Sequence, residues 1–401
     1  MSTPPALSHS IPSRAGVSAL LVGHCAGMLD LVALPVWVGA ALIGAFKLDP
    51  QQAGLLASLF LAGQVISSAL LAPRFGRIPH RITVVVGFAI AALSFLGVSQ
   101  AQSYGVMAAL HLTGGLGAGC ALSVTHGTIG RTANPHRLFA MAGFALAVFG
   151  IFVLGGGSKL VNTLGGPALF VLFSGLMLVA LVVALIAFPR SVGTRAAMSK
   201  TAEKLPSQVW FGMFGIGLMT LGQAMFFSYV ERIGVDRGYT ASFVTGVLIT
   251  VGFVNLIPGP LAGFLQGKLR AESVIFVGPL LYAAVVLAIS QVQTPEVYAS
   301  GVPVLIGLVV FTHTFLFGLL ARFDPSGRAV AATPAMVMIG AAIGPVLGGT
   351  VVKFAGYTWL GALVAFIGVA SALCFLGVRR HTGAACIQPA STAPQTRDML
   401  R

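Results

Sequence analysis

The residue most suited to take part in chemistry is Asp30, which lies near the middle of the apolar run from Val17 to Ala45. That run is longer than the roughly 20 residues that an α-helix needs to cross a bilayer. A charge at the bilayer centre costs on the order of 2.5–3.5 kcal/mol on insertion scales, so the carboxylate must face protein or a watery cavity. Two interpretations follow. Either Asp30 binds and releases a proton during a transport cycle, or it is a protonated carboxyl that only hydrogen-bonds a neighbouring helix.

Small residues accompany this carboxylate along its predicted helix. Gly23 and Gly27 lie on the same side as Asp30, and their four-residue spacing lets another helix approach the backbone closely. Pro35 lies just over one turn further on and lacks an N–H, so it is expected to kink the helix. The pattern therefore predicts that Asp30 faces other helices.

A second polar face is predicted further along the chain. Gln223, Phe227 and Glu231 are spaced at i, i+4 and i+8, which places them on one side of a helix. An amide, an aromatic ring and a carboxylate suit an amphipathic ligand, and we predict that the three bind substrate. The alternative is ordinary packing, with Glu231 in an external loop pair. Asn255, in the next span, either contacts substrate or hydrogen-bonds between helices.

Several classes of function are excluded by what the sequence lacks. It has no GxxxxGK[ST] phosphate loop, no metal-spaced set of His and Cys, and no nucleophile or metal set of an enzyme. The net charge of +14 is spread over short clusters between apolar runs, which is not the pattern of a nucleic-acid surface. We therefore expect no enzyme, no catalytic residue, no metal, no cofactor and no nucleic-acid partner.

The elements that position these residues are predicted to be membrane-spanning helices. Hydrophobic residues make up 57% of the chain and charged residues 8%, against about 25% charged in a soluble domain. No loop is long enough to fold as a separate domain. The predicted spans cover residues 17–42, 50–72, 82–100, 104–128, 138–160, 167–188, 208–231, 240–262, 272–291, 299–320, 330–352 and 358–378.

The basic residues divide unequally between the two sets of loops. Of the 23 Lys and Arg residues, 18 fall in the tails, the linker and the loops on the same predicted side. Because basic loops stay in the cytoplasm, both termini and the linker are expected there, with the protein in the inner (plasma) membrane. The predicted segments are an N-terminal tail (1–15), a six-helix bundle (16–188), a linker (189–206), a second bundle (207–378) and a C-terminal tail (379–401).

Two motifs occur at matching places in this layout, and a third occurs in the eleventh span although its usual place is the fifth. Residues 69–77, after the second span, read A-L-L-A-P-R-F-G-R, which resembles G-x-L-a-D-r-x-G-r with Pro73 in place of the acid. Residues 111–119 read H-L-T-G-G-L-G-A-G, which resembles R-x-x-x-G-x-G-x-G with His111 in place of Arg. Residues 340–349 read G-A-A-I-G-P-V-L-G-G, which resembles the antiporter motif G-x-x-x-G-P-x-x-G-G. With the six-linker-six layout, these motifs make the chain similar to the major facilitator superfamily.

The resemblance implies an all-α membrane fold of twelve transmembrane helices in two six-helix bundles related by pseudo-two-fold symmetry. It also implies that helices one, four and ten border a central cavity. Asp30 and His111 are then expected to form a proton-coupling pair, while His111 as a neutral ring on a backbone carbonyl is the alternative. His313 is expected to contact substrate. The residues expected to take part in gating are Arg74, Gly76, Arg77, Gly344 and Pro345.

The function that the sequence favours is proton-coupled secondary transport of a small organic molecule by alternating access. Its partners are the substrate, protons and the lipid bilayer, and a monomer is expected. Efflux of a drug or metabolite by antiport is preferred, because an isolated Asp in the first helix and the G-P-x-x-G-G motif resemble multidrug antiporters. Import of a nutrient or siderophore-like compound by symport is the alternative. A non-transporting membrane sensor, a membrane-embedded enzyme and a channel are the other classes considered.

Overall fold

The computed structural model describes residues 13–189, 206–323 and 328–385. Most of the predicted tails and linker therefore lie outside the described residues. Eleven helical segments in the described residues are long and apolar enough to cross a membrane. The last of them, Met336–Val378, has 43 residues, about twice the length of one crossing. Its chain is interrupted at Gly356, where φ is 84°, so this segment contains two spans and the predicted total of twelve is confirmed.

The N-terminal half contains the first six spans. The first consists of three consecutive pieces and the second of two, whereas the other four are single helices. The elements are α1 (Arg14–Gly27), α2 (Leu29–Leu34) and the π-helix η1 (Pro35–Ala45); α3 (Pro50–Leu71) and the 3₁₀-helix η2 (Ala72–Arg77); α4 (His80–Gln100); α5 (Tyr104–Gly130); α6 (Pro135–Leu164); and α7 (Gly166–Ala187).

The C-terminal half contains the other six spans. Its first two spans are also broken, and its last two form the interrupted α14. The elements are α8 (Ser207–Phe227) and α9 (Val230–Asp236); α10 (Ala241–Val254) and α11 (Pro258–Leu265); α12 (Ala271–Gln291); α13 (Pro295–Phe323); and α14 (Arg328–Ala385).

Local sequence signals explain where many of these helices start. Asp49 caps α3, since its Oδ1 accepts from Gln52 N at 2.9 Å while Pro50 occupies the first helical position. Ser103 and Thr240 cap α5 and α10 through their side-chain oxygens in the same way. Each cap satisfies an amide that would otherwise meet the low-polarity membrane region without a partner.

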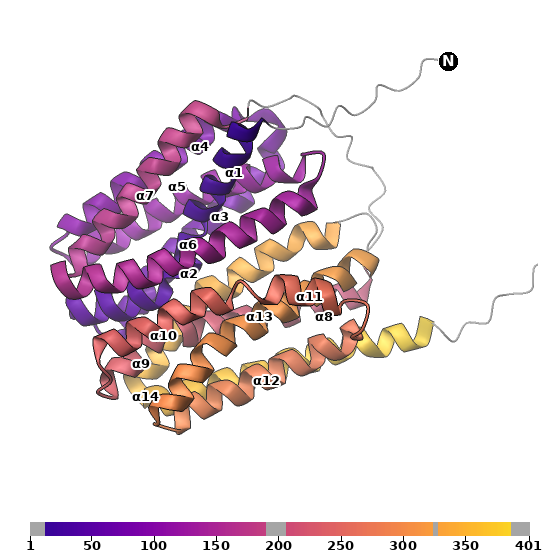
Figure 1. Ribbon diagram of the computed structural model, residues 1–401. Coiled ribbons are helices and arrows are strands. Elements are labelled where there is room, and N and C mark those ends of the chain that lie inside the picture. Colours follow the sequence, from indigo (N-terminus) through magenta and orange to yellow (C-terminus); the bar gives the residue numbers. More distant parts are fainter. Residues whose placement is uncertain (1–12, 190–205, 324–327, 386–401) are drawn as a thin grey trace, which may run out of the picture.

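The two halves form two six-helix bundles that lie side by side (Figure 1). We call the end at which Arg14 begins α1 and at which Pro189 and Pro206 flank the linker the linker face. We call the opposite end, which carries Asp49 and α9, the far face. The halves meet where α3 packs against α14, α6 against α10, and η1 against α9.

Within each bundle, glycines let helices pack backbone to backbone. A Cβ on Gly344 of α14 would lie 2.6 Å from Ala224 Cβ and 2.8 Å from Met225 N of α8. In the other half, a Cβ on Gly115 would overlap the carbonyl of Phe60 in α3. The Gly344 face of α14 therefore packs closely against α8.

The main difference from the sequence prediction is that three spans are broken. The first span is interrupted at Met28, where φ is −104° and ψ is 14°, and it becomes a π-helix from Pro35 onward. The seventh span is interrupted at Ser228 and Tyr229, and the eighth between Val254 and Pro258. A proline has no N–H for the preceding turn, which accounts for the changes at Pro35 and Pro258.

Candidate functional site

Asp30 lies in the first turn of α2, directly after the break at Met28. Its side chain is buried, with an exposed fraction of 1%, and neither Oδ1 nor Oδ2 has a hydrogen-bond partner within the described part of the chain. A charged carboxylate without partners is costly in such surroundings. The neutral, protonated form avoids that cost.

The polar neighbour of Asp30 is Gln64 on α3, whose side chain lies within interaction range of the carboxyl. Gln64 Nε2 donates to Gly27 O at 3.0 Å, which leaves its Oε1 buried and without a partner. Asp30 and Gln64 thus present acceptor oxygens that lack a donor. The neutral form of Asp30 can donate one hydrogen bond as well as accept, whereas the charged form can only accept.

His111 has a different setting from the one expected. Its Nδ1 lies 2.7 Å from Met107 O and its Nε2 accepts from Trp37 Nε1 at 3.3 Å, which assigns the neutral ring with the proton on Nδ1. The ring stacks on Trp37 with centroids 5.5 Å apart and meets Phe170 edge-on. No hydrogen bond joins His111 to Asp30. In this conformation the ring fits the alternative role of a buried, satisfied imidazole, and its part in proton coupling stays a prediction.

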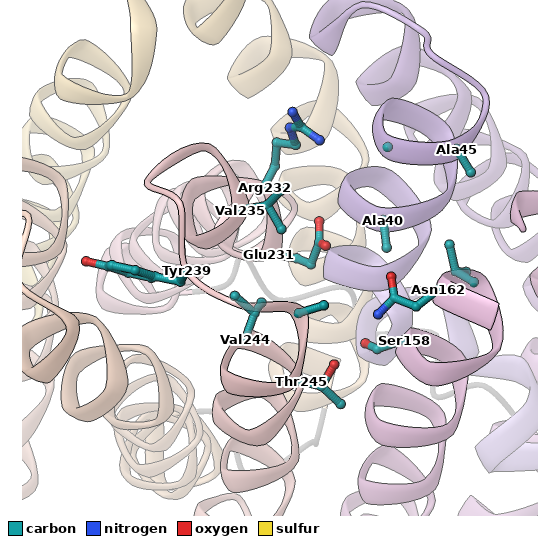
Figure 2. Close-up of a pocket in the computed structure, with 13 residues that line it drawn as sticks. Ala40, Ala45, Ser158, Asn162, Glu231, Arg232, Val235, Tyr239, Val244 and Thr245 are labelled. Carbon is teal, nitrogen blue, oxygen red and sulfur yellow. The ribbon is translucent and has the colours of Figure 1, made fainter.

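A cavity of about 360 Å³ lies between the two halves toward the far face. It is bounded by η1 and α6 of the N-terminal half and by α9 and α10 of the C-terminal half (Figure 2). Its wall combines aliphatic and polar side chains in about equal number. Its lining residues are Ala40, Gly44, Ala45, Ser158, Val161, Asn162, Glu231, Arg232, Val235, Tyr239, Ala241, Val244 and Thr245.

Glu231 is the buried carboxylate of this cavity. It lies in the first turn of α9, and Tyr298 holds that turn by donating to Val230 O at 2.7 Å. Its exposed fraction is 8%, and Oε2 has no hydrogen-bond partner among the described residues. The approach from the other half is close because Gly39 has no side chain: a Cβ there would overlap Glu231 Oε2. Glu231 therefore lies where the two halves meet.

The other predicted substrate-binding residues lie elsewhere. Gln223 and Phe227 are on α8, and the break after Phe227 removes the continuous helix that would have aligned them with Glu231. Asn255 follows α10 and His313 lies on α13; each has a buried atom without a partner, Oδ1 and Nε2 respectively. None of these four residues lines the cavity, so the structure does not bring the predicted set together.

The halves are joined at the far face by a crossing that sequence reasoning missed. The Tyr229 hydroxyl lies 2.7 Å from Pro345 O and 3.0 Å from Pro50 O, so its one proton is shared between α14 and α3. Gly54 and Gly349 permit the approach, because a Cβ on either would overlap the Tyr229 hydroxyl and a proline carbonyl. No local sequence signal distinguishes Tyr229 from its aromatic neighbours Phe226 and Phe227.

Further polar contacts lie close to this crossing. Lys353 Nζ pairs with Asp49 Oδ2 at 3.1 Å, and the hydroxyl of Ser58 accepts from Val346 N at 3.0 Å. The hydrogen bonds and the ion pair that join the halves in the described ranges lie in this far-face region. The expected gating residues Arg74, Gly76 and Arg77 are exposed at the linker face, the side on which they were expected. Arg74 donates to Leu70 O of its own half at 2.6 Å, and the gating role of all three stays a prediction.

Comparisons with known proteins agree with this architecture. The sequence profile of the Major Facilitator Superfamily matches residues 19–323. The structure is similar to that of the nucleoside transporter NupG, with a TM-score of 0.73 and 13% identity over 90% of this chain and 99% of that chain. It is also similar to the D-xylose-proton symporter, with a TM-score of 0.69 and 17% identity over 90% and 95% of the two chains. No curated protein matches the sequence.

Proposed function

The chain belongs to the major facilitator superfamily of membrane transporters, and from that premise we propose that it is a proton-coupled exporter of a small organic molecule. The observation that carries the proposal is the buried carboxyl of Asp30, whose two oxygens have no hydrogen-bond partner among the described residues and which has the Gln64 side chain within interaction range. Protonation changes the hydrogen bonds available to both groups. Family membership favours transport over the sensor and enzyme alternatives.

The contacts between the halves support an alternating-access cycle. They hold the far face closed, which is one of the two states that such a cycle requires. The basic residues of the linker face support a cytoplasmic location for that face, with both termini inside. In this orientation the structure represents the state closed to the outside. Release of substrate outside then requires the Tyr229 crossing to open.

Asp30 is the proposed coupling residue because its two protonation states need different partners. The neutral carboxyl is stable where it lies, whereas the charged form is stabilised by any rearrangement that brings water or a donor to it. A proton can drive the conformational equilibrium only through such a difference in affinity between states. His111 is the second candidate, and proton uptake on its Nε2 requires loss of the Trp37 hydrogen bond.

The decisive experiment is transport by the full chain in proteoliposomes. A thermal-shift screen of metabolites and drugs first identifies a compound that stabilises the folded protein saturably. Wild-type protein should then concentrate that compound when a pH gradient is imposed. Asp30→Asn should still exchange the compound in counterflow but should not concentrate it. Glu296→Gln, which changes an exposed acid at the start of α13, is the matched control and should behave as wild type.

The direction of proton movement separates export from import. Compound added outside vesicles without a pH gradient should alkalinise the lumen if the protein is an antiporter, because a proton leaves as the compound enters. Acidification would establish symport and overturn the export proposal. Import remains the second candidate, because the D-xylose-proton symporter has the same fold. Accumulation by Asp30→Asn equal to that of wild type would show that Asp30 is not the coupling residue.

A further inference from the structure

Two histidines of the N-terminal half meet inside the membrane-spanning region. His24 Nδ1 on α1 lies 2.9 Å from His126 Nε2 on α5, and the two ring centroids are 5.1 Å apart. One of these nitrogens carries the hydrogen and the other accepts it, so the bond contains one proton that either ring can own. The second nitrogen of each ring has no hydrogen-bond partner among the described residues.

The pair lies between the linker face and Asp30. His126 is partly exposed and lies four residues before Gly130, where α5 ends at that face. His24 lies in the last turn of α1 with an exposed fraction of 7%, and Asp30 lies in the first turn of α2 with 1%. Burial therefore increases from His126 through His24 to Asp30, as on a path from the linker face into the bundle.

The stretch of α1 between His24 and Asp30 is short and carries polar groups. The two residues are six apart, which corresponds to about 9 Å along a helix axis at 1.5 Å per residue. On this stretch Gln64 Nε2 donates to Gly27 O at 3.0 Å, and the Gln64 side chain lies within interaction range of the Asp30 carboxyl. A polar side chain thus lies beside the path where water has to carry a proton.

No charge fixes the protonation state of either ring. The helices packed against α1 include α5, α6 and α7, and no side chain of these elements forms an ion pair or a further hydrogen bond with the pair among the described residues. Arg131, at the end of α5, lies over the Phe75 ring at 4.3 Å instead. The helix α7 has no titratable side chain. By sequence, the other titratable side chains on α1, α2, α5 and α6 are Arg14, Cys25, Asp30, Tyr104, His111, Cys120, His136, Arg137 and Lys159.

The choice of side chain points to proton transfer as well as to packing. An amide or a hydroxyl is enough to join two helices by a hydrogen bond, and Gln64 joins α3 to α1 in that way. Histidines within membrane spans are rare and mark proton pathways. An imidazole both takes up and gives up a proton near neutral pH, on two different nitrogens.

We propose that His24 and His126 form a proton relay between Asp30 and the linker face. A proton from Asp30 passes through water to His24 Nε2, the proton on His24 Nδ1 moves to His126 Nε2, and His126 releases the proton on its Nδ1 to water at the linker face. Each step breaks one bond to hydrogen and forms one, and the rings regain their starting tautomers by exchange with water. The same steps in reverse protonate Asp30.

This relay deepens the proposed function and rests on Asp30 as the coupling residue. The test follows protons alone, so no substrate is needed. The full chain in lipid nanodiscs is brought to a pH at which Asp30 is ionised, and a flash then releases protons from a photolabile caged acid. Time-resolved infrared absorption of protonated carboxyl groups reports the rate, and the Asp30 contribution is the part that Asp30→Asn lacks.

Variants of the pair should slow this protonation. His24→Gln and His126→Gln should each reduce the rate about tenfold or more, since a positioned acid–base group contributes about 10²–10⁴-fold. The final amplitude should match wild type, because glutamine preserves a hydrogen bond and the relay changes only the rate. His80→Gln is the matched control, since His80 is a buried histidine of the same half that is bonded to Phe75 O at 2.9 Å. It should show the wild-type rate.

Chemical rescue separates proton transfer from packing. In His126→Ala, imidazole in solution should restore most of the lost rate, because this position is partly exposed. Pyrazole has the same size and shape but is a much weaker base, so it should restore nothing. Rescue by both compounds alike would show that the ring only fills space. Should His24→Gln not fold, the two His126 variants carry the same test.

Wild-type rates in both glutamine variants, with the Asp30 absorption intact, would overturn the relay and leave Asp30 as the coupling residue. An Asp30 contribution that is absent at every pH would overturn both the relay and the proposed coupling. The two failures are therefore distinguishable. Slow protonation in both variants, the wild-type rate in His80→Gln and rescue by imidazole alone would establish the relay.

Discussion

Asp30 and Glu231 have the same local setting but lie in different parts of the molecule. Each follows an interruption of its span, at Met28 with φ −104° and ψ 14° and at Tyr229 with φ −110° and ψ 0°. Each lies in the first turn of the helix that restarts and is buried with an unpartnered oxygen. The sequences on either side share no motif, so the similarity is one of backbone geometry.

Their neighbours differ. The polar neighbour of Asp30 is Gln64 of the same half, whereas Glu231 lies against Gly39 and lines a cavity with Ser158 of the opposite half. The helix that carries Asp30, α2, also contacts α8 of the opposite half, so the surroundings of this carboxyl can change when the halves move. A carboxylate at the boundary changes surroundings whenever the halves separate. Breaks in the helices thus position the two acids, and the packing of the halves determines the surroundings of each.

The largest expected effect tests this division of roles directly. Asp30→Asn should reduce substrate accumulation under a pH gradient to equality across the membrane, because the titrating group is gone. Glu231→Gln, assayed at saturating substrate, should still accumulate it. Accumulation and counterflow are measured in the same vesicles. Accumulation by Asp30→Asn together with loss of accumulation in Glu231→Gln would contradict this division of roles.

A second test addresses the packing of α14 on α8, the helix that precedes the break before Glu231. Gly344→Leu should destabilise the protein by about 1–3 kcal/mol or more through overpacking, because the new side chain meets the backbone of α8 at Met225. The folded yield and the unfolding temperature of the purified protein are the measurements. Gly175→Leu is the matched control, since a Cβ there meets nothing within 4 Å. Equal yields of the two variants would contradict the α8 contact.

A smaller effect is expected from the hydroxyl that joins the halves. Tyr229→Phe removes the donor shared by Pro345 O and Pro50 O, a loss of about 1 kcal/mol. That energy corresponds to a roughly fivefold shift of population toward far-face opening. Spin labels at the exposed far-face positions Gln102 and Gln293 report the distance between the halves. An unchanged distance distribution would show that the crossing holds without the hydroxyl.

The smallest effect concerns the exposed ion pair. Partial burial alone raises the pKa of Asp49, but hydrogen bonds from Gln52 N and Lys353 Nζ hold that pKa below its usual value. Stabilisation by the pair is therefore complete above the unfolded pKa of about 4 and is lost only as pH falls through the lower folded value. Between about pH 5 and pH 8 we expect Asp49→Asn to change the spin-label distances little, since exposed pairs contribute about 0–1 kcal/mol. A strong pH dependence of wild type in that range that vanishes in Asp49→Asn would assign the proton response to this pair instead of Asp30.

Sequence alone determined the twelve spans, their approximate ends and the chemical importance of Asp30. The thickness of the hydrocarbon region sets the length of each apolar run, and caps such as Asp49 with Gln52 act over a few residues. A carboxylate in the middle of an apolar run needs no tertiary information to be recognised. The family motifs belong to the same category, since they are contiguous in the chain.

Tertiary structure alone decided which side chains meet. Tyr229 finds its acceptors in Pro50 and Pro345, which are distant in sequence and belong to different halves, and Trp37 occupies the ring nitrogen of His111. The sequence left Glu231 open between substrate binding and an external loop pair with Arg232, and packing against η1 buries it. The breaks at Met28 and Tyr229 reorient both acids without a proline at either break. Apolar periodicity indicates which residues avoid water. Which polar groups become partners depends on how the helices pack, and the linear pattern does not contain that information.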